Sequence, residues 1–306
     1  MLSAQKIVAK KLLAPVNRMA FASKDHYYKI MPNLDETRTD LMQMVESFGE
    51  AEVKPLADEM DKSMKFPHHM WKRMGDQGLL GITAAEEYGG LGLGYYEHCL
   101  CVEQLSKANA GFALSYLAHS NLCVNQFEHN ASEAQKAKYL PGLCAGDLVG
   151  ALAMSEPNSG SDVTSMQLKA EKKGDKYILN GSKMWITNGP TADVIWVYAK
   201  TDMNAGHKGI STFIIEKDFP GFSIAQKLDK LGMRGSETGE LVFEDCEVPA
   251  ENLVAQEGSG VYIMMKGLDS ERLILSAGAL GIHQAAMDEA STYTSDRKQF
   301  GKKLIE

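Results

Sequence analysis

The sequence predicts an α+β protein with an N-terminal helical domain, a middle antiparallel β domain, and a C-terminal helical bundle that is present only in part. Two observations support this order. Apolar residues recur every three or four positions over residues 35–148 and again over residues 260–306, which is the period of a helix packed on one face. Residues 149–258 instead hold short β-branched and aromatic runs between Gly, Pro, Asn and Asp, as antiparallel strands do.

The composition excludes several classes of protein. The chain has 306 residues, of which 44% are hydrophobic and 24% charged, as in ordinary globular domains. A net charge of −8 argues against a protein that neutralises nucleic-acid phosphates. No apolar run is long enough for a membrane span, and the five cysteines lack the spacing of a zinc site. We therefore expect no nucleic acid, no membrane span, no metal and reduced thiols.

Residues 1–24 contain several basic residues and no acidic one, with apolar residues at helical spacing. This pattern is typical of a mitochondrial transit peptide. A basic terminal arm without a targeting role is the alternative. Targeting would place the protein in the mitochondrial matrix.

Gly and Pro separate the periodic segments of residues 35–148, so we expect a bundle of helices there. In the β region, Asn180-Gly181 stands between two runs of KYILNGSKMWITN. Because Asn-Gly favours two-residue turns, we predict a hairpin at this dipeptide. The helical period that returns at Gly260 is expected to persist to Glu306.

Two stretches of the β region carry candidate binding chemistry. ALAMSEPNSGSDVTSM, residues 151–166, turns through Pro, Gly and small hydroxyl residues. Its backbone N–H groups suit a phosphate or the edge of a flat heteroaromatic ring, although a surface turn is the alternative. In KMWITNG, Trp185 and Thr187 share one face of a strand. They could cover a ring and bond to its edge, or belong to a core.

Glu271 is a carboxylate within an almost wholly apolar helical stretch, KGLDSERLILSAGALG. On a helical wheel the predicted apolar stripe consists of Val261, Met264, Leu268, Leu275 and Ile282. Glu271 lies within roughly 60° of this stripe, so its carboxylate is expected to point toward packed surface. Burial would raise its pKa toward neutrality and suit it to act as a base. A solvated boundary charge is the alternative.

MSEPNSGSDV and WITNG, in this order and between helical regions, resemble the flavin-site motifs of the acyl-CoA dehydrogenase family. YGGLGL (88–93), KLGMRGSETGELVFEDCEVP (230–249) and RKQFGKKL (297–304) are similar to further segments of that family. The resemblance runs from about Asp35 to the end. It implies FAD, an acyl-CoA substrate, electron-transfer flavoprotein as partner, and a homotetramer as the family's full-length form.

By this resemblance, Ser155 and Thr187 would serve the polar edge of the flavin, and Ser161 would also meet the acyl-CoA. Arg297 would reach the FAD pyrophosphate of a neighbouring subunit. The implied cofactor-binding residues are Leu152, Ala153, Met154, Ser155, Glu156, Pro157, Asn158, Ser159, Gly160, Ser161, Trp185, Ile186, Thr187 and Arg297.

Most family members keep the catalytic base in a later loop, but some place it on the helix that corresponds to LDSERLILSAGALG. These include the branch that converts isovaleryl-CoA to 3-methylcrotonyl-CoA in leucine catabolism, which this stretch resembles. Glu271 would then be the catalytic base. The implied substrate-binding residues are Ser161, His207, Lys208, Tyr262, Asp269, Ser270, Glu271 and Arg272. For His207 and Lys208, an exposed polar loop is the alternative.

Family members usually extend beyond the position of Glu306, through the rest of a helical C-terminal domain. We therefore expect this chain alone to bind FAD poorly and to turn over slowly. Two alternatives to an isovaleryl-CoA-converting enzyme remain. One is a non-catalytic or unstable product of the same fold, and the other is an acyl-CoA dehydrogenase or oxidase of different chain-length specificity.

Overall fold

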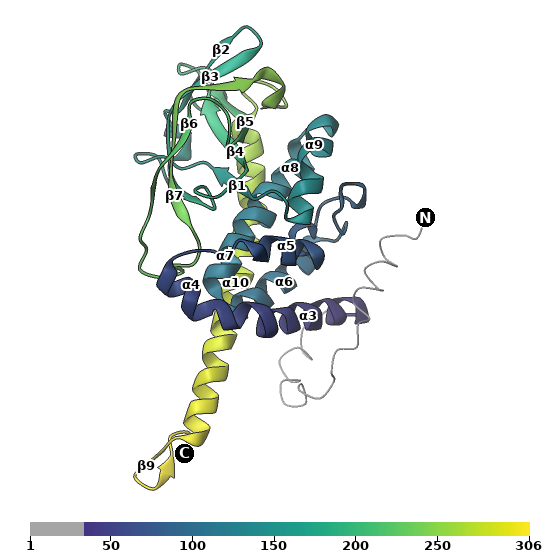
Figure 1. Cartoon of the computed structure of the whole chain (residues 1–306), viewed down its shortest axis with the longest axis vertical. Helices are drawn as coiled ribbons and strands as arrows, with labels where there is room; N and C mark the ends of the chain where they lie inside the picture. Colours follow the sequence, from purple (N-terminus) through teal and green to yellow (C-terminus); the bar gives the residue numbers. More distant parts are fainter. Residues whose placement is uncertain (1–33) are drawn as a thin grey trace.

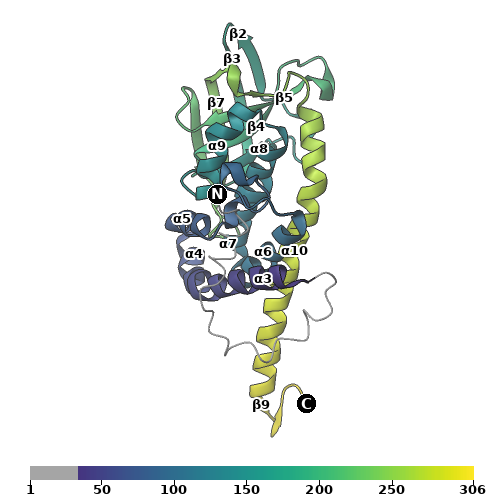
Figure 2. The ribbon, with the colours of Figure 1, turned by 90° about the vertical axis from the view of Figure 1, so that its right-hand side faces the viewer.

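The computed structural model describes residues 34–306, so the predicted transit peptide at residues 1–24 lies outside the described part. Helices make up one half of the molecule and a β-sheet the other (Figure 1), and one long helix runs along both (Figure 2). The α+β class predicted from the sequence is confirmed. Among the described residues, no helix is long and apolar enough to cross a membrane.

The helices of the helical half precede the first strand of the sheet in the sequence. Its helices are α3 (Glu36–Phe48), α4 (Ala57–Ser63), α5 (His69–Asp76), α6 (Tyr95–Ala108), α7 (Ala110–Leu117), α8 (Asn125–Asn130) and α9 (Glu133–Ala145). Asn109 starts α7 by accepting the Phe112 N–H at 3.0 Å, and Ser132 and Gln135 form a capping box for α9, so polar caps satisfy otherwise unpaired amides. A π-helical segment, Ala118–Val124, joins α7 to α8.

The β half is one sheet of eight strands within the described residues. The strands are β1 (Gly150–Ala153), β2 (Lys169–Lys173), β3 (Lys176–Thr187), β4 (Val194–Lys200), β5 (Ile210–Glu216), β6 (Phe222–Lys227), β7 (Thr238–Pro249) and β8 (Leu253–Val254). Their order is β6-β7-β3-β2-β4-β5-β8, with β1 paired to β4. Most pairs are antiparallel, but β1 and β2 each run parallel to β4. MSEPNSGSDV therefore starts beside an interior strand.

The predicted hairpin at Asn180-Gly181 is wrong. β3 passes through this dipeptide as one strand, and the turn between β2 and β3 is Gly174-Asp175. At Gly181 the register of β3 against β7 shifts, and the Asn180 side chain accepts the Asp245 N–H at 2.8 Å. Gly181 has a φ of 139°. A β-bulge and a tight turn both need such backbone freedom, so the same dipeptide serves either one.

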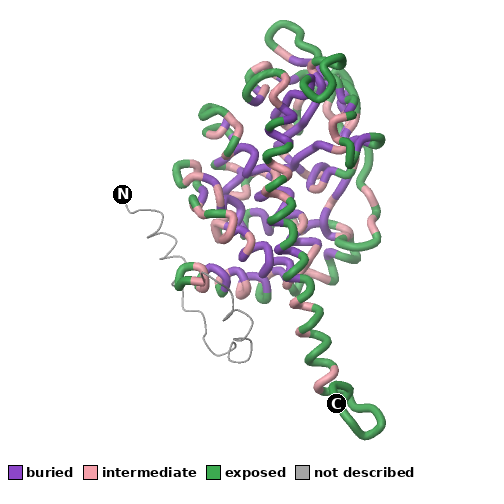
Figure 3. Tube along the Cα trace, turned by 180° about the vertical axis from the view of Figure 1, so that it is seen from behind, coloured by how far each residue is buried: buried purple, intermediate pink, exposed green. Residues whose placement is uncertain are grey.

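The long helix α10 (Gly260–Asp296) links the two halves. Near its start, Ile263 and Met264 pack into a core shared with the sheet. About three to four turns further on, Ile274 and Ala277 pack into the helical core. Figure 3 shows that its last part extends beyond the other helices and is mostly exposed.

Two expectations for this region need correction. The predicted stripe is only partly buried, because Leu275 and Ile282 are exposed, where α10 has left the sheet and packs mainly against α6. The helix also ends at Asp296 rather than continuing to Glu306. It is followed by a small hairpin of β9 (Lys298–Gln299) and β10 (Lys302–Lys303), whose tip contains Gly301 with a φ of 79°.

Glycine permits the close crossing of α10 over α6. A Cβ at Gly281 would lie 2.1 Å from the Glu103 carbonyl oxygen, so no other residue fits without a backbone shift. A Cβ at Gly278 would meet first the Ser106 hydroxyl at 3.2 Å, which can turn away. The crossing therefore depends on Gly281 far more than on Gly278.

Gly281→Ala is expected to lower the free energy of unfolding by about 1–3 kcal/mol, because overpacking moves the two helix backbones apart. Gly278→Ala is the matched control and should stay within about 1 kcal/mol of the wild type, since the higher helix propensity of Ala offsets mild crowding. Urea unfolding followed by circular dichroism measures both variants. Equal losses in the two would contradict the backbone contact.

Candidate active site

The two motif loops lie directly against each other. The loop of residues 154–161 leaves β1, and residues 185–187 end β3. The Met184 N–H donates to the Ser155 carbonyl at 2.9 Å, and the Lys183 ammonium donates to the Met154 carbonyl at 2.9 Å. The structure thus brings the candidate flavin-binding stretches together at one edge of the β half.

Trp185 has the least ordinary geometry of this region. Its φ is 68°, which is rare for a bulky residue, and its side chain is 60% exposed. The pairing of β3 with β7 shifts its register between Lys183 and Ile186, around this left-handed residue. Ile186 is buried and Thr187 half-buried. Strain combined with an exposed indole points to a surface shaped for a ligand rather than for a core.

The predicted loop residues divide into an inner and an outer set. Leu152, Ala153, Met154, Glu156 and Ser159 are buried, Ser155 is half-buried, and Pro157, Asn158, Gly160 and Ser161 are exposed. Two backbone hydrogen bonds between Glu156 and Ser159, at 2.8 and 3.1 Å, close a tight turn. A Cβ at Gly160 would meet nothing within 4 Å, so a ligand can approach this backbone.

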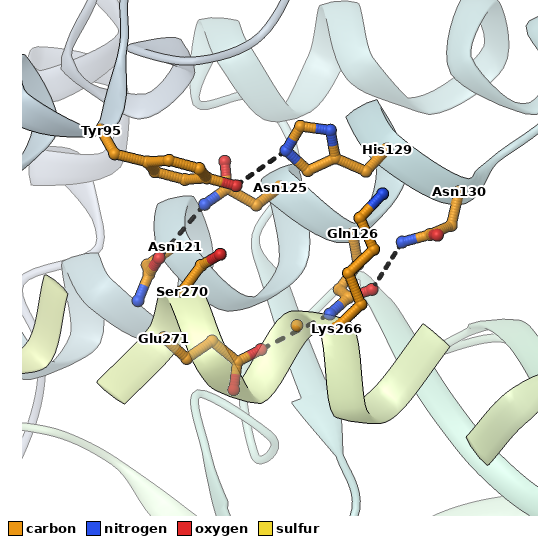
Figure 4. Close-up of a pocket in the computed structure, with 10 residues that line it drawn as sticks. Tyr95, Asn121, Asn125, Gln126, His129, Asn130, Lys266, Ser270 and Glu271 are labelled. Atoms are coloured by element: carbon orange, nitrogen blue, oxygen red, sulfur yellow. Dashed lines mark hydrogen bonds between the residues drawn. The ribbon is translucent and has the colours of Figure 1, made fainter. Parts of the chain in front are cut away.

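A pocket of about 160 Å³ lies beside α10. Figure 4 shows its lining side chains, with those of α8 facing α10. The lining residues are Tyr95, Asn121, Asn125, Gln126, His129, Asn130, Lys266, Gly267, Ser270 and Glu271.

Within this pocket, the Gln126 amide donates to Glu271 Oε1 at 3.5 Å and its own oxygen accepts from Asn130 at 2.9 Å. A Cβ at Gly267 would lie 2.0 Å from the Gln126 amide nitrogen. Glycine at this turn of α10 therefore makes room for the amide beside the carboxylate.

Burial raises the pKa of Glu271 from 4.5 to about 7, while the Gln126 hydrogen bond and the Arg272 charge act more weakly in the opposite direction. The carboxylate also adds to the rise in the pKa of the Tyr198 phenol on β4, which comes mainly from burial. The Gln126 hydrogen bond places the Glu271 carboxylate against α8. A carboxylate with a pKa near the working pH suits general base catalysis.

Four of the remaining predicted residues lie on α10. Tyr262, Asp269 and Arg272 are exposed and Ser270 is half-buried. His207 and Lys208 are exposed in the turn Gly206–Gly209, which packs near the start of α10. These side chains thus lie near the half of α10 that carries Glu271.

Arg297 is the predicted residue that the structure does not bring to the others. It follows the C-terminal end of α10, 26 positions from Glu271, which corresponds to about 40 Å along a helix. It cannot reach the motif loops of its own chain. Within the described residues, no group of His, Cys, Asp and Glu could hold a metal ion.

Sequence reasoning missed Gln126, Asn130 and Lys183. The first two lie one turn apart in NQFEHN of α8, so a polar face of a helix was visible, but its partner was not. Lys183 stands between Ser182 and Met184 in β3 and is completely buried. Its neighbours from Gly181 to Trp185 are exposed or half-buried, so nothing in the local sequence pattern signalled the burial of this lysine.

Comparisons with known proteins point to the same family along residues 35–306. Family models match for the acyl-CoA dehydrogenase N-terminal domain at residues 35–147, middle domain at 151–246 and C-terminal domain at 258–306. The chain is 57% identical to mitochondrial isovaleryl-CoA dehydrogenase of Arabidopsis thaliana, over 89% of this chain and 67% of that protein. It is 55% identical to mitochondrial 2-methylacyl-CoA dehydrogenase of Solanum tuberosum, over 89% of this chain and 67% of that protein. The chain thus spans about two thirds of these relatives.

Solved structures show the same fold. One, described as the electron transferring flavoprotein of Acidaminococcus fermentans, matches with a TM-score of 0.88 and 42% identity over 90% of this chain and 73% of that chain. A glutaryl-CoA dehydrogenase of Mycobacterium smegmatis in complex with FADH2 matches with a TM-score of 0.83 and 32% identity. The match covers 89% of this chain and 68% of that chain.

Glu271→Gln is expected to stabilise the protein at pH 8. Because the folded pKa of about 7 lies above the unfolded value of 4.5, the folded state loses stability as the pH rises through this window. Removing the charge should restore roughly 1–3 kcal/mol at pH 8 and much less at pH 5. Urea unfolding at both pH values tests this, with Glu289→Gln, exposed on the same helix, as control. A gain independent of pH would exclude titration as its cause.

Proposed function

Because this chain belongs to the acyl-CoA dehydrogenase family, we propose that it dehydrogenates isovaleryl-CoA to 3-methylcrotonyl-CoA with FAD, in leucine catabolism. Glu271 carries the proposal. Its carboxylate is held on α10 with a pKa of about 7, on the helix that the isovaleryl branch uses for its base. The 57% identity to an isovaleryl-CoA dehydrogenase favours the same substrate.

The residues present fit a flavin ring. Trp185 offers an exposed indole on a strained backbone, and Gly160 leaves the adjacent loop open to a flat ligand. Ser155 and Thr187, both half-buried, would bond to its polar edge, and the remaining residues of 152–161 and 185–187 would support it. Arg297 would hold the pyrophosphate of a neighbouring subunit's FAD. When bound, FAD supplies the acceptor for the hydride that leaves Cβ.

Glu271 would remove the Cα proton of the thioester. At neutral pH about half of these groups are ionised, given a pKa of about 7. Gln126 holds the carboxylate oxygen, which favours one orientation of the base. The proton then resides on a Glu271 oxygen until it is released to solvent.

The exposed side of α10 would bind the acyl-CoA. Tyr262, Asp269 and Arg272 are exposed along it, with Ser270 beside the base and Ser161 in the opposite loop. His207 and Lys208 add basic character near the start of α10, where cationic side chains suit the phosphates of CoA. The substrate would lie between α10 and the motif loops.

The setting of the enzyme is also a proposal. Relatives named as mitochondrial favour the mitochondrial matrix, in agreement with a transit peptide at residues 1–24. Electron-transfer flavoprotein would accept the electrons, and the full-length form would be a homotetramer, as in the family.

A second candidate substrate is a 2-methyl-branched acyl-CoA, favoured by the 55% identity to a 2-methylacyl-CoA dehydrogenase. Anaerobic reduction of the flavin by isovaleryl-CoA, 2-methylbutyryl-CoA and butyryl-CoA separates the candidates. The highest kcat/KM with isovaleryl-CoA supports the first proposal. Absence of bleaching with all three would overturn dehydrogenation. Turnover with oxygen alone, in the absence of electron-transfer flavoprotein, would indicate an oxidase.

Glu271→Gln is expected to slow flavin reduction by isovaleryl-CoA at least 100-fold, because loss of a general base typically costs 10²–10⁴-fold. Binding of the substrate should stay within a few-fold. Stopped-flow absorbance at 450 nm is the measurement, and Glu289→Gln is the control at an exposed site of α10. Wild-type reduction by Glu271→Gln would remove Glu271 from the mechanism.

The pH profile of kcat/KM is expected to rise through an apparent pKa of about 7, since the base must be ionised. Gln126→Leu should move this pKa upward, because the hydrogen bond from Gln126 lowers the pKa of Glu271. Asn130→Leu retains the direct bond and should produce a smaller shift. A profile that is unchanged in Gln126→Leu would show that the amide does not tune the base.

A further inference from the structure

A buried ion pair lies beneath the two candidate flavin loops. The Lys183 ammonium is 2.9 Å from Glu156 Oε1 and 2.9 Å from the Met154 carbonyl oxygen. The two side chains are 0% and 7% exposed. Burial lowers the pKa of Lys183 to about 8 against the opposing effect of Glu156. Burying charge is costly, and apolar replacements often stabilise a fold equally well, so stability alone does not account for the pair.

Glu156 connects both ends of its loop. Its Oε2 accepts the Gln167 N–H at 2.6 Å, and its Oε1 accepts the Leu168 N–H at 3.0 Å. The carboxylate therefore points inward, away from the exposed turn at Pro157 and Asn158. Two backbone amides and one ammonium converge on this single group, which fixes the start of the loop to its return into β2.

Lys183 connects the same loop to the strand that presents Trp185. It stands two residues before Trp185, where the register shift of β3 begins, and the Met184 N–H adds a bond to the Ser155 carbonyl at 2.9 Å. The other end of WITNG is held separately, by Asn188 donating to the Ser115 carbonyl at 2.8 Å. The strained residue thus lies between two buried anchors.

We propose that the Lys183–Glu156 pair is a positioning device for the flavin ring, which sets the spacing between Ser155 and the Trp185 indole without touching the ring. The proposal rests on the proposed function, since it takes FAD as the ligand of these loops. A neutral or apolar pair would leave the loop and the bulge of β3 joined only by backbone contacts. The distance between Ser155 and the Trp185 indole, on either side of the ring, would then vary.

FAD titration of the apo-protein tests the pair. Lys183→Met and the isosteric Glu156→Gln should each weaken FAD binding at least tenfold, and at saturating FAD should shift the flavin absorption bands and midpoint potential. Lys217→Met is the matched control. It breaks a short pair with Asp193, 2.6 Å apart, whose lysine is exposed, and should leave FAD binding within twofold.

The readouts separate positioning from mere stability. A lower melting temperature of the apo-variants, with wild-type FAD affinity, absorption and potential at saturation, would overturn the proposal. If either single variant fails to fold, the double variant Lys183→Met/Glu156→Leu removes both charges. Wild-type flavin properties in it would overturn the proposal, and weakened, shifted FAD would support it. A wild-type chain that does not bind FAD would instead overturn the proposed function itself.

Discussion

The packing of α10 between the sheet and the helical half determines the chemistry of Glu271. Met264 contacts the core that contains Trp196 of β4, and Ile274 lies in the helical core. With apolar anchors on either side, the intervening turns cannot rotate their carboxylate into water. A base with a raised pKa is therefore a consequence of how the two halves are joined, and no neighbouring carboxylate is needed to produce it.

The order of helical and β regions could be predicted because local periodicity encodes it. The direction of Glu271 could also be predicted, since a helical wheel needs only the helix. The wheel misjudged Leu275 because periodicity does not tell where the sheet ends and solvent begins. Asn180-Gly181 was misassigned because bulges and turns demand the same backbone freedom. Gln126 and Lys183 were not foreseeable, since their roles depend on partners distant in the sequence.

Costly features cluster where the proposed chemistry takes place. The left-handed backbone at Trp185, the buried Lys183–Glu156 pair and the desolvated carboxylate of Glu271 each oppose folding. The aliphatic and aromatic cores on either side of α10 offset these terms. Local departures from the rules of stable design are expected at functional sites, and here they identify the same region as the sequence motifs.

The separation of Glu271 and Arg297 by most of α10 has a thermodynamic consequence. If Arg297 completes the cofactor site of a neighbouring molecule, cofactor binding and subunit association stabilise each other by mass action. Dilution of the protein would then release FAD without any change in the loops that hold its ring. The rigid length of one helix would make cofactor occupancy a property of the assembly, dependent on protein concentration.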